Sequence, residues 1–172
     1  MLVIGIGHKA RQGKDTAARA IIKECTAQGL YAKQYGFCDA LKAYCRVLGM
    51  REKDAPLLQT VGTNVFRHLD PDIWVRILQD TLWEQQPDVA VITDVRFPNE
   101  VEGIRALGGK VIKVVRVDEN WQPWVSPDRD PNHESEIALD SYKGWDAEFE
   151  SLDALSLEQL VVCWFRKERM TP

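Results

Sequence analysis

The stretch that decides the fold is MLVIGIGHKARQGKDT, residues 1–16. Leu2 to Ile6 is a short apolar run that ends at Gly7, which is typical of a buried strand. From Asp15 to Gln28 the apolar residues recur at helical spacing. A strand, a turn rich in glycine and lysine, and a helix in direct succession predict the start of an α/β fold.

The turn is typical of a phosphate-binding loop. Its letters GHKARQGKDT, residues 7–16, approach the pattern G-x-x-x-x-G-K-[ST], in which backbone amides, a helix N-terminus and the lysine surround phosphate oxygens. Two departures stand out, because His8 occupies the place of the first glycine and Asp15 replaces the hydroxyl residue that binds Mg²⁺. We expect Asp15 or Thr16 to hold Mg²⁺, directly or through water. The predicted phosphate-binding residues are Lys9, Ala10, Arg11, Gln12, Gly13, Lys14, Asp15 and Thr16. A glycine- and lysine-rich turn without a ligand is the alternative.

Strands and helices alternate along the rest of the chain. Further strands are predicted at 30–37, 89–93 and 110–117, and helices at 40–48, 55–68, 72–86, 100–107 and near the C-terminus. Because parallel strands need crossover helices, this order predicts a doubly wound α/β fold with a parallel sheet of about five strands flanked by helices. Ligands of such sheets bind beyond the carboxyl ends of the strands. We expect one domain, residues 1–172, with a helical insertion at about 39–86 and a lid-like loop at about 117–135.

Composition narrows the class of protein. A chain of 172 residues with 45% hydrophobic residues can bury a real core, and the net charge of −4 lacks the positive charge of a protein that clamps long nucleic acid. No apolar run approaches the roughly 18–20 residues that span a membrane, so we expect a cytoplasmic protein. The cysteines, Cys25, Cys38, Cys45 and Cys163, show no metal-binding spacing, and buried positions are predicted for them.

Four groups of residues, in this order, resemble bacteriophage deoxynucleoside monophosphate kinases. They are GKDT at 13–16, LQxxGT at 58–63 followed by Arg67 and DxW at 72–74, TDVRFPNE at 93–100, and HxSE at 133–136. The resemblance covers most of the chain and implies the nucleoside monophosphate kinase version of the P-loop fold. It also implies transfer of the γ-phosphate of ATP to a deoxynucleoside monophosphate with Mg²⁺, often by a homodimer, in the host cytoplasm if the protein is encoded by a phage.

Charged residues at the strand ends are the candidates for chemistry. Asp94 can accept a hydrogen bond from an acceptor hydroxyl or organise Mg²⁺ through water, and Arg96 can bind a phosphate with both arms of its guanidinium group. An ion pair between the two that steadies the turn is the alternative. Further positive charge is expected from Arg116 at a strand end, from Arg129 in the lid-like loop and from His133. The predicted catalytic residues are Lys14, Asp94, Arg96, Arg116 and Arg129.

The resemblance places the acceptor nucleotide after the second strand. The predicted acceptor-binding residues are Phe37, Asp39, Lys42, Gln59, Thr63, Arg67, Trp74, Glu100, His133 and Glu136. Phe37 or Trp74 can stack on a base, and Arg67 can neutralise the α-phosphate. A core position is favoured for Trp74, helix capping is an even alternative for Glu100, and a structural role is favoured for His133.

Two other functions compete with this hypothesis. One keeps the fold and phosphorylates 5-hydroxymethyluracil already in DNA, for which Arg67, His68 and Arg76 are conceivable parts of a basic channel. The negative net charge argues mildly against it. The other is a nucleotide-binding module without transfer activity, which Lys14, Asp94 and Arg96 disfavour. Phosphoryl transfer needs positioning and electrostatics, so we expect no cysteine or serine nucleophile.

Overall fold

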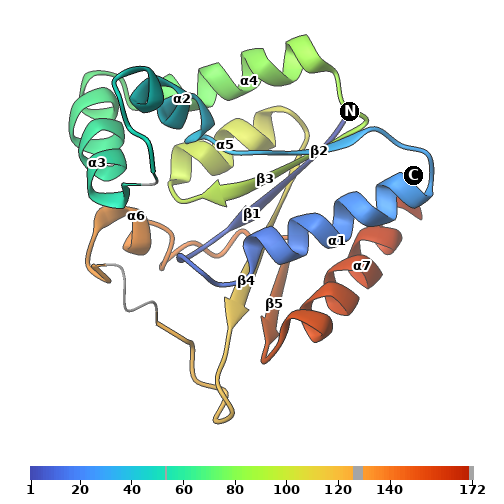
Figure 1. Ribbon diagram of the computed structural model, residues 1–172. Coiled ribbons are helices and arrows are strands. Elements are labelled where there is room, and N and C mark those ends of the chain that lie inside the picture. Colours follow the sequence, from blue (N-terminus) through green and yellow to red (C-terminus); the bar gives the residue numbers. More distant parts are fainter. Residues whose placement is uncertain (53, 126–129, 171–172) are drawn as a thin grey trace.

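The computed structural model describes residues 1–52, 54–125 and 130–170, and its centre is a five-stranded parallel sheet with helices on both faces (Figure 1). The strands are β1 (Leu2–Gly7), β2 (Ala32–Tyr35), β3 (Val89–Val95), β4 (Lys110–Arg116) and β5 (Ala147–Ser151). Their order across the sheet is β2-β3-β1-β4-β5, so the turn after β1 lies near the middle of the carboxyl edge. The predicted parallel sheet of about five strands is confirmed.

The two faces of the sheet carry separate apolar clusters. On one face, Ile4 and Ile6 pack with Ile21 of α1 (Lys14–Ala27) and Phe165 of α7 (Ala154–Met170). Figure 1 shows α1 and α7 side by side on this face, and they contact each other. On the other face, Val3 belongs to a cluster with residues of α2 (Asp39–Val47), α4 (Ile73–Gln85) and α5 (Pro98–Ala106). Successive residues of β1 therefore serve opposite faces, as expected for a strand covered on both sides.

The helical block beside β2 differs from the prediction in its middle part. It consists of α2 (Asp39–Val47), α3 (Ala55–Gln59), the π-helix η1 (Thr60–Arg67) and α4 (Ile73–Gln85), where the sequence predicted a continuous α-helix at 55–68. A Cβ atom at Gly62 would lie 2.5 Å from Cδ2 of Leu41, and the indole N–H of Trp74 donates to the Gly62 carbonyl at 3.2 Å. These close contacts accompany the wider helical turn, and π-helical turns of this kind often occur at functional sites.

The strand β5 was missed in the sequence. Glu148 and Glu150 separate Ala147, Phe149 and Ser151, so the five residues lack the continuous apolar run of the inner strands. This strand lies at the edge of the sheet, where Phe149 packs against Trp164 with ring centroids 6.1 Å apart. The remaining helices are α5 (Pro98–Ala106) and the four-residue α6 (Glu134–Ile137).

Two smaller predictions need correction. No regular element was predicted in the loop at about 117–135, but Val117 forms an isolated antiparallel bridge with Pro123, and Asp118 accepts hydrogen bonds from the backbone of Asn120 and Gln122. Buried positions were predicted for the cysteines, but Cys163 is exposed on α7 because the buried positions Val161 and Phe165 lie on the opposite helix face.

All four cysteines are free thiols. Within the described ranges, no helix is long and apolar enough to cross a membrane.

Candidate active site

The loop between β1 and α1 has the conformation that its glycines permit. Gly13 has a φ of 98°, and a Cβ atom there would lie 2.7 Å from Cδ2 of Leu157. A Cβ atom at Gly7 would collide with the ring of Trp145 at 2.7 Å. His8, which stands where the phosphate-loop pattern has a glycine, has a φ of 84°. The backbone therefore turns through a left-handed residue at both ends of the loop.

Lys14 lies inside this loop and is only 7% exposed. Its Nζ donates to the carbonyl of His8 at 3.2 Å and to the carbonyl of Lys9. Burial and the positive charge of Arg96 lower the pKa of Lys14 well below its usual value, while nearby carboxylates oppose the shift. Phosphate oxygens in this loop would favour the charged amine, so binding an anion and keeping Lys14 protonated support each other.

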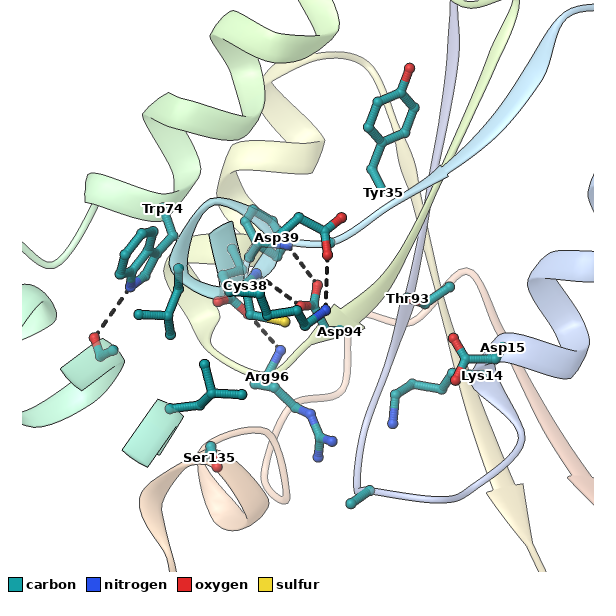
Figure 2. Close-up of a pocket in the computed structure, with 18 of the residues that line it drawn as sticks. Lys14, Asp15, Tyr35, Cys38, Asp39, Trp74, Thr93, Asp94, Arg96 and Ser135 are labelled. Atoms are coloured by element: carbon teal, nitrogen blue, oxygen red, sulfur yellow. Dashed lines mark hydrogen bonds and ion pairs between the residues drawn. The ribbon is translucent and has the colours of Figure 1, made fainter. Parts of the chain in front are cut away.

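A cavity of about 710 Å³ extends from this loop along the carboxyl ends of β2 and β3 (Figure 2). Its size falls within the range of small-molecule sites, about 300–1,000 Å³. Most of the predicted site residues lie around it, although they come from six separate parts of the chain. These are Ala10, Arg11, Gly13, Lys14, Asp15, Thr16, Phe37, Asp39, Lys42, Thr63, Arg67, Trp74, Asp94, Arg96, Glu100 and Glu136.

Arg96 and Lys14 reach into the same part of the cavity from different elements (Figure 2). Arg96 follows β3, and its Nη1 lies 3.2 Å from Oε1 of Glu136. The other oxygen of Glu136 accepts the backbone N–H of Ala10, in the phosphate loop, at 2.9 Å. Glu136 thus connects the phosphate loop to the guanidinium group of Arg96, a contact that the sequence did not predict.

Asp94 joins the ends of β3 and β2. Its carboxylate accepts the backbone N–H groups of Phe37 at 2.8 Å and Cys38 at 3.0 Å (Figure 2). The alternative ion pair with Arg96 is not formed in the described part of the chain, where Arg96 pairs with Glu136. Cys38 also lines the cavity and was not predicted as a site residue. Burial and then the negative charge of Asp94 raise the pKa of the Cys38 thiol to about 12, which disfavours a thiolate.

Glu100 is buried at the acceptor end of the cavity, with 1% of its surface exposed. Its carboxylate accepts the backbone N–H groups of Arg96 at 2.6 Å and Phe97 at 3.1 Å, and it forms an ion pair with Arg67. The guanidinium group of Arg67 lies 4.2 Å from the centroid of the Phe97 ring. Burial raises the pKa of Glu100 to about 7, although Arg67 opposes the shift. Glu100 thus caps the first turn of α5, as the alternative interpretation expected, and it also forms an ion pair that the sequence did not predict.

Among the described residues, four predicted site residues lie away from the cavity lining: Lys9, Gln12, Arg116 and His133. The amine of Lys9 donates to Asp140 at 3.0 Å. The buried side chain of Gln12 bonds to the backbone of Arg116 and Trp124, and the Arg116 guanidinium group lies 4.9 Å from the Trp124 ring centroid. His133 caps α6 by accepting the N–H of Ser135. Arg129 and the side chain of Gln59 lie outside the described residues.

Asp15 and Thr16 fit the chemistry of a magnesium site. Both lie beside Lys14 on the cavity wall and offer oxygen atoms, which Mg²⁺ prefers. The amide of Gln34, which the sequence analysis missed, donates to Asp15 at 2.8 Å and to Thr93 at 3.0 Å. In the described ranges no group of three or more His, Cys, Asp or Glu residues can hold a metal. Phosphate oxygens and water would therefore complete the coordination of an ion at Asp15 and Thr16.

A phosphate loop at the centre of a sheet ordered β2-β3-β1-β4-β5, with a cavity leading to a helical cover, defines a P-loop kinase. Solved structures share this fold. Shikimate kinase from Aquifex aeolicus superposes with a TM-score of 0.60 at 13% identity and covers 100% of both chains. The APS kinase CysC of Mycobacterium tuberculosis has a TM-score of 0.52 at 11% identity, covering 95% of this chain and 96% of its own.

The chain belongs to the deoxynucleotide monophosphate kinase family, whose profile matches residues 50–140. A putative deoxynucleotide monophosphate kinase of Acanthamoeba polyphaga mimivirus is 30% identical over 179 residues, covering 85% of this chain and 86% of the relative. The deoxynucleoside-5'-monophosphate kinase of Escherichia phage T5 is 54% identical over 50 residues, which are 28% of this chain and 20% of the phage protein. The family resemblance is thus confirmed, and the protein is a nucleotide kinase, which counts against a module without transfer activity.

Proposed function

We propose that the protein transfers the γ-phosphate of ATP to a deoxynucleoside monophosphate and forms the diphosphate. The observation that carries this proposal is that the cavity is lined by Lys14 of the phosphate loop, by Arg96 close to it (Figure 2), and by Arg67 beneath the helical cover. A donor phosphate chain at one end and an acceptor phosphate at the other would meet between these cations. The family of the chain supports the same substrate class.

On the donor side, Lys14 and the amides of the loop at 8–15 would hold the β- and γ-phosphates. Bound Mg²⁺, held by Asp15 or Thr16, would neutralise charge on the phosphate oxygens. Arg96 lies on the cavity wall where it can contact the transferred group, and its fork of N–H donors matches phosphate geometry. Positioning and charge stabilisation suffice for this reaction, so the enzyme needs no covalent intermediate.

On the acceptor side, the helical insertion at about 39–86 would cover the monophosphate. Arg67 would bind its phosphate, and Phe37, Asp39, Lys42 and Thr63 would contact its base and sugar. The indole N–H of Trp74 is already bonded to Gly62, so this side chain would contribute an apolar wall.

Transfer of label from [γ-³²P]ATP tests this function directly. The enzyme, with Mg²⁺, is incubated with each of the four common deoxynucleoside 5′-monophosphates and, in parallel, with an oligonucleotide that contains 5-hydroxymethyluracil. We expect label on one or more free nucleotides. Label on the oligonucleotide alone would move the function to DNA modification, and label on neither acceptor would overturn the proposal.

A further inference from the structure

We infer that Glu100 is a positioning residue of the acceptor-phosphate site, because it holds Arg67 and the backbone of Arg96 so that both guanidinium groups face the cavity. This inference rests on the proposed function, which makes the cavity end beside Arg67 the place of the acceptor phosphate. Glu100 itself is not expected to touch the acceptor, since its carboxylate oxygens are already occupied by protein donors.

The geometry assigns one carboxylate oxygen to each arginine. Oε1 of Glu100 accepts from Nη2 of Arg67, at the end of η1. Oε2 accepts the N–H of Arg96 at 2.6 Å and the N–H of Phe97 at 3.1 Å, in the turn between β3 and α5. The Phe97 ring then packs under the Arg67 guanidinium group at 4.2 Å. One buried side chain therefore fixes two segments that the sequence separates widely.

A helix cap alone does not explain this arrangement. Capping the first turn of α5 requires an acceptor for the Phe97 N–H, and an exposed acidic residue can supply it at no cost of burial. Glu100 is instead 1% exposed, and a buried ion pair is poor evidence for stability because both charges lose their hydration. The burial is explained if the pair fixes the direction of Arg67, whose remaining N–H groups can then meet a phosphate.

The same geometry makes acceptor binding depend on pH. Burial raises the pKa of Glu100 to about 7, and the charged groups that act on it are Arg67 of η1, which lowers the pKa, and Asp94 of β3, which raises it. The backbone N–H of Arg96 also lowers it. Below about pH 7 the protonated carboxyl group no longer pairs with Arg67, so the arginine loses its fixed direction. Glu100→Gln imitates this protonated state at every pH, since its amide is neutral and still accepts one backbone hydrogen bond.

The test measures, by calorimetry, the affinity for each of the four common deoxynucleoside 5′-monophosphates and for a nonhydrolysable ATP analogue, from pH 6 to pH 8. We expect E100Q to bind the acceptor at least about tenfold more weakly than wild type at pH 8 and about equally at pH 6. Comparing the two proteins at each pH cancels the titration of the ligand phosphate. Affinity for the ATP analogue should not change. Glu102→Gln is the matched control, because Glu102 is exposed on the same helix.

Several results would overturn the inference. They are equal acceptor affinity of E100Q and wild type at pH 8, a ratio that does not change with pH, or an equal loss for the acceptor and the ATP analogue. If E100Q does not fold, the ratio of Arg67→Ala to wild type replaces it, and that ratio must also grow with pH. Label transfer by wild type is measured in parallel. Its absence would refute the proposed function, whereas a flat pH profile with active transfer would refute only the role of Glu100.

Discussion

The two ends of the cavity hold their cations by different means. At the phosphate loop, Nζ of Lys14 bonds to the main-chain carbonyls of His8 and Lys9, which lie within six residues along the chain. At the acceptor end, Arg67 pairs with the buried carboxylate of Glu100, and Arg96, which lies between the two ends, pairs with the buried carboxylate of Glu136. In both pairs the two partners come from distant elements. The donor end therefore depends on local backbone shape, whereas the acceptor end depends on side-chain pairs that can change charge with pH or substitution.

The largest effect is expected at the donor end. Lys14→Met keeps the apolar length of the side chain but removes its only charge, so the phosphate loop loses its buried cation. We expect kcat to fall about a thousandfold or more, because charge stabilisation supplies most of the acceleration in this reaction class. Steady-state transfer of label from ATP measures the loss.

Lys23→Met is the matched control, because Lys23 lies exposed on the same helix α1 and should retain full activity. An active K14M enzyme with an unchanged circular dichroism spectrum would show that the loop lysine is not part of the transfer machinery.

The donor end could be predicted from sequence because its information is contiguous. Ten contiguous residues specify the loop, because a strand precedes them, Gly7 and Gly13 lie within them and a helix follows. A contiguous motif of this kind predicts the local backbone conformation. The parallel sheet could be predicted for a similar reason, since each inner strand is an apolar run. The edge strand β5 was not predicted, because Glu148 and Glu150 face solvent and interrupt its run of apolar residues.

The partners at the acceptor end could not be predicted in this way. Arg67, Arg96, Glu100 and Glu136 were recognised as polar site candidates, but which carboxylate meets which arginine depends on how η1, α5 and α6 pack against the sheet. Spacing along the chain carries no signal for such contacts. The same limit applies to Gln12, whose side chain accepts the backbone N–H of Arg116 at the end of β4, a contact that the sequence did not predict.

The next largest effect is expected for Arg96. Arg96→Lys keeps the positive charge but loses the planar fork that can contact two phosphate oxygens and Glu136 together. We expect kcat to fall about a hundredfold while the KM for ATP changes little, because the contact matters most in the transition state. Separate measurement of kcat and KM for both substrates checks this.

Arg46→Lys serves as the reference, since Arg46 is exposed on α2. A fall in R96K confined to the KM for the acceptor would assign Arg96 to acceptor binding alone.

Glu136 tests whether the two ends of the cavity act separately, because its carboxylate contacts both the phosphate loop and Arg96. Glu136→Gln retains an acceptor for the Ala10 N–H but removes the charge that pairs with Arg96. We expect kcat/KM to fall about tenfold for both substrates, since misplacement of one charged group lowers the rate without removing the group.

Glu134→Gln, exposed on the same short helix α6, should behave as wild type. A loss for one substrate only would place Glu136 with that end of the cavity and would weaken the distinction between the two ends.

The last expected effect is on stability. The pKa of Glu100 rises from an ordinary 4.5 to about 7 on folding, so the folded protein binds this proton more tightly than the unfolded chain. Between those pH values the unfolded state releases the proton first, and the stability contributed by Glu100 falls as the pH rises. Compared with Glu100→Gln, wild type should lose about 2–3 kcal/mol of unfolding free energy between pH 4.5 and pH 7. Urea unfolding at both pH values measures this difference, and Glu102→Gln should follow wild type throughout. If the difference in unfolding free energy between wild type and Glu100→Gln is the same at both pH values, the Glu100 carboxyl group has an ordinary pKa, because Arg67 compensates its burial fully. The acceptor end would then lack the pH response that separates it from the phosphate loop.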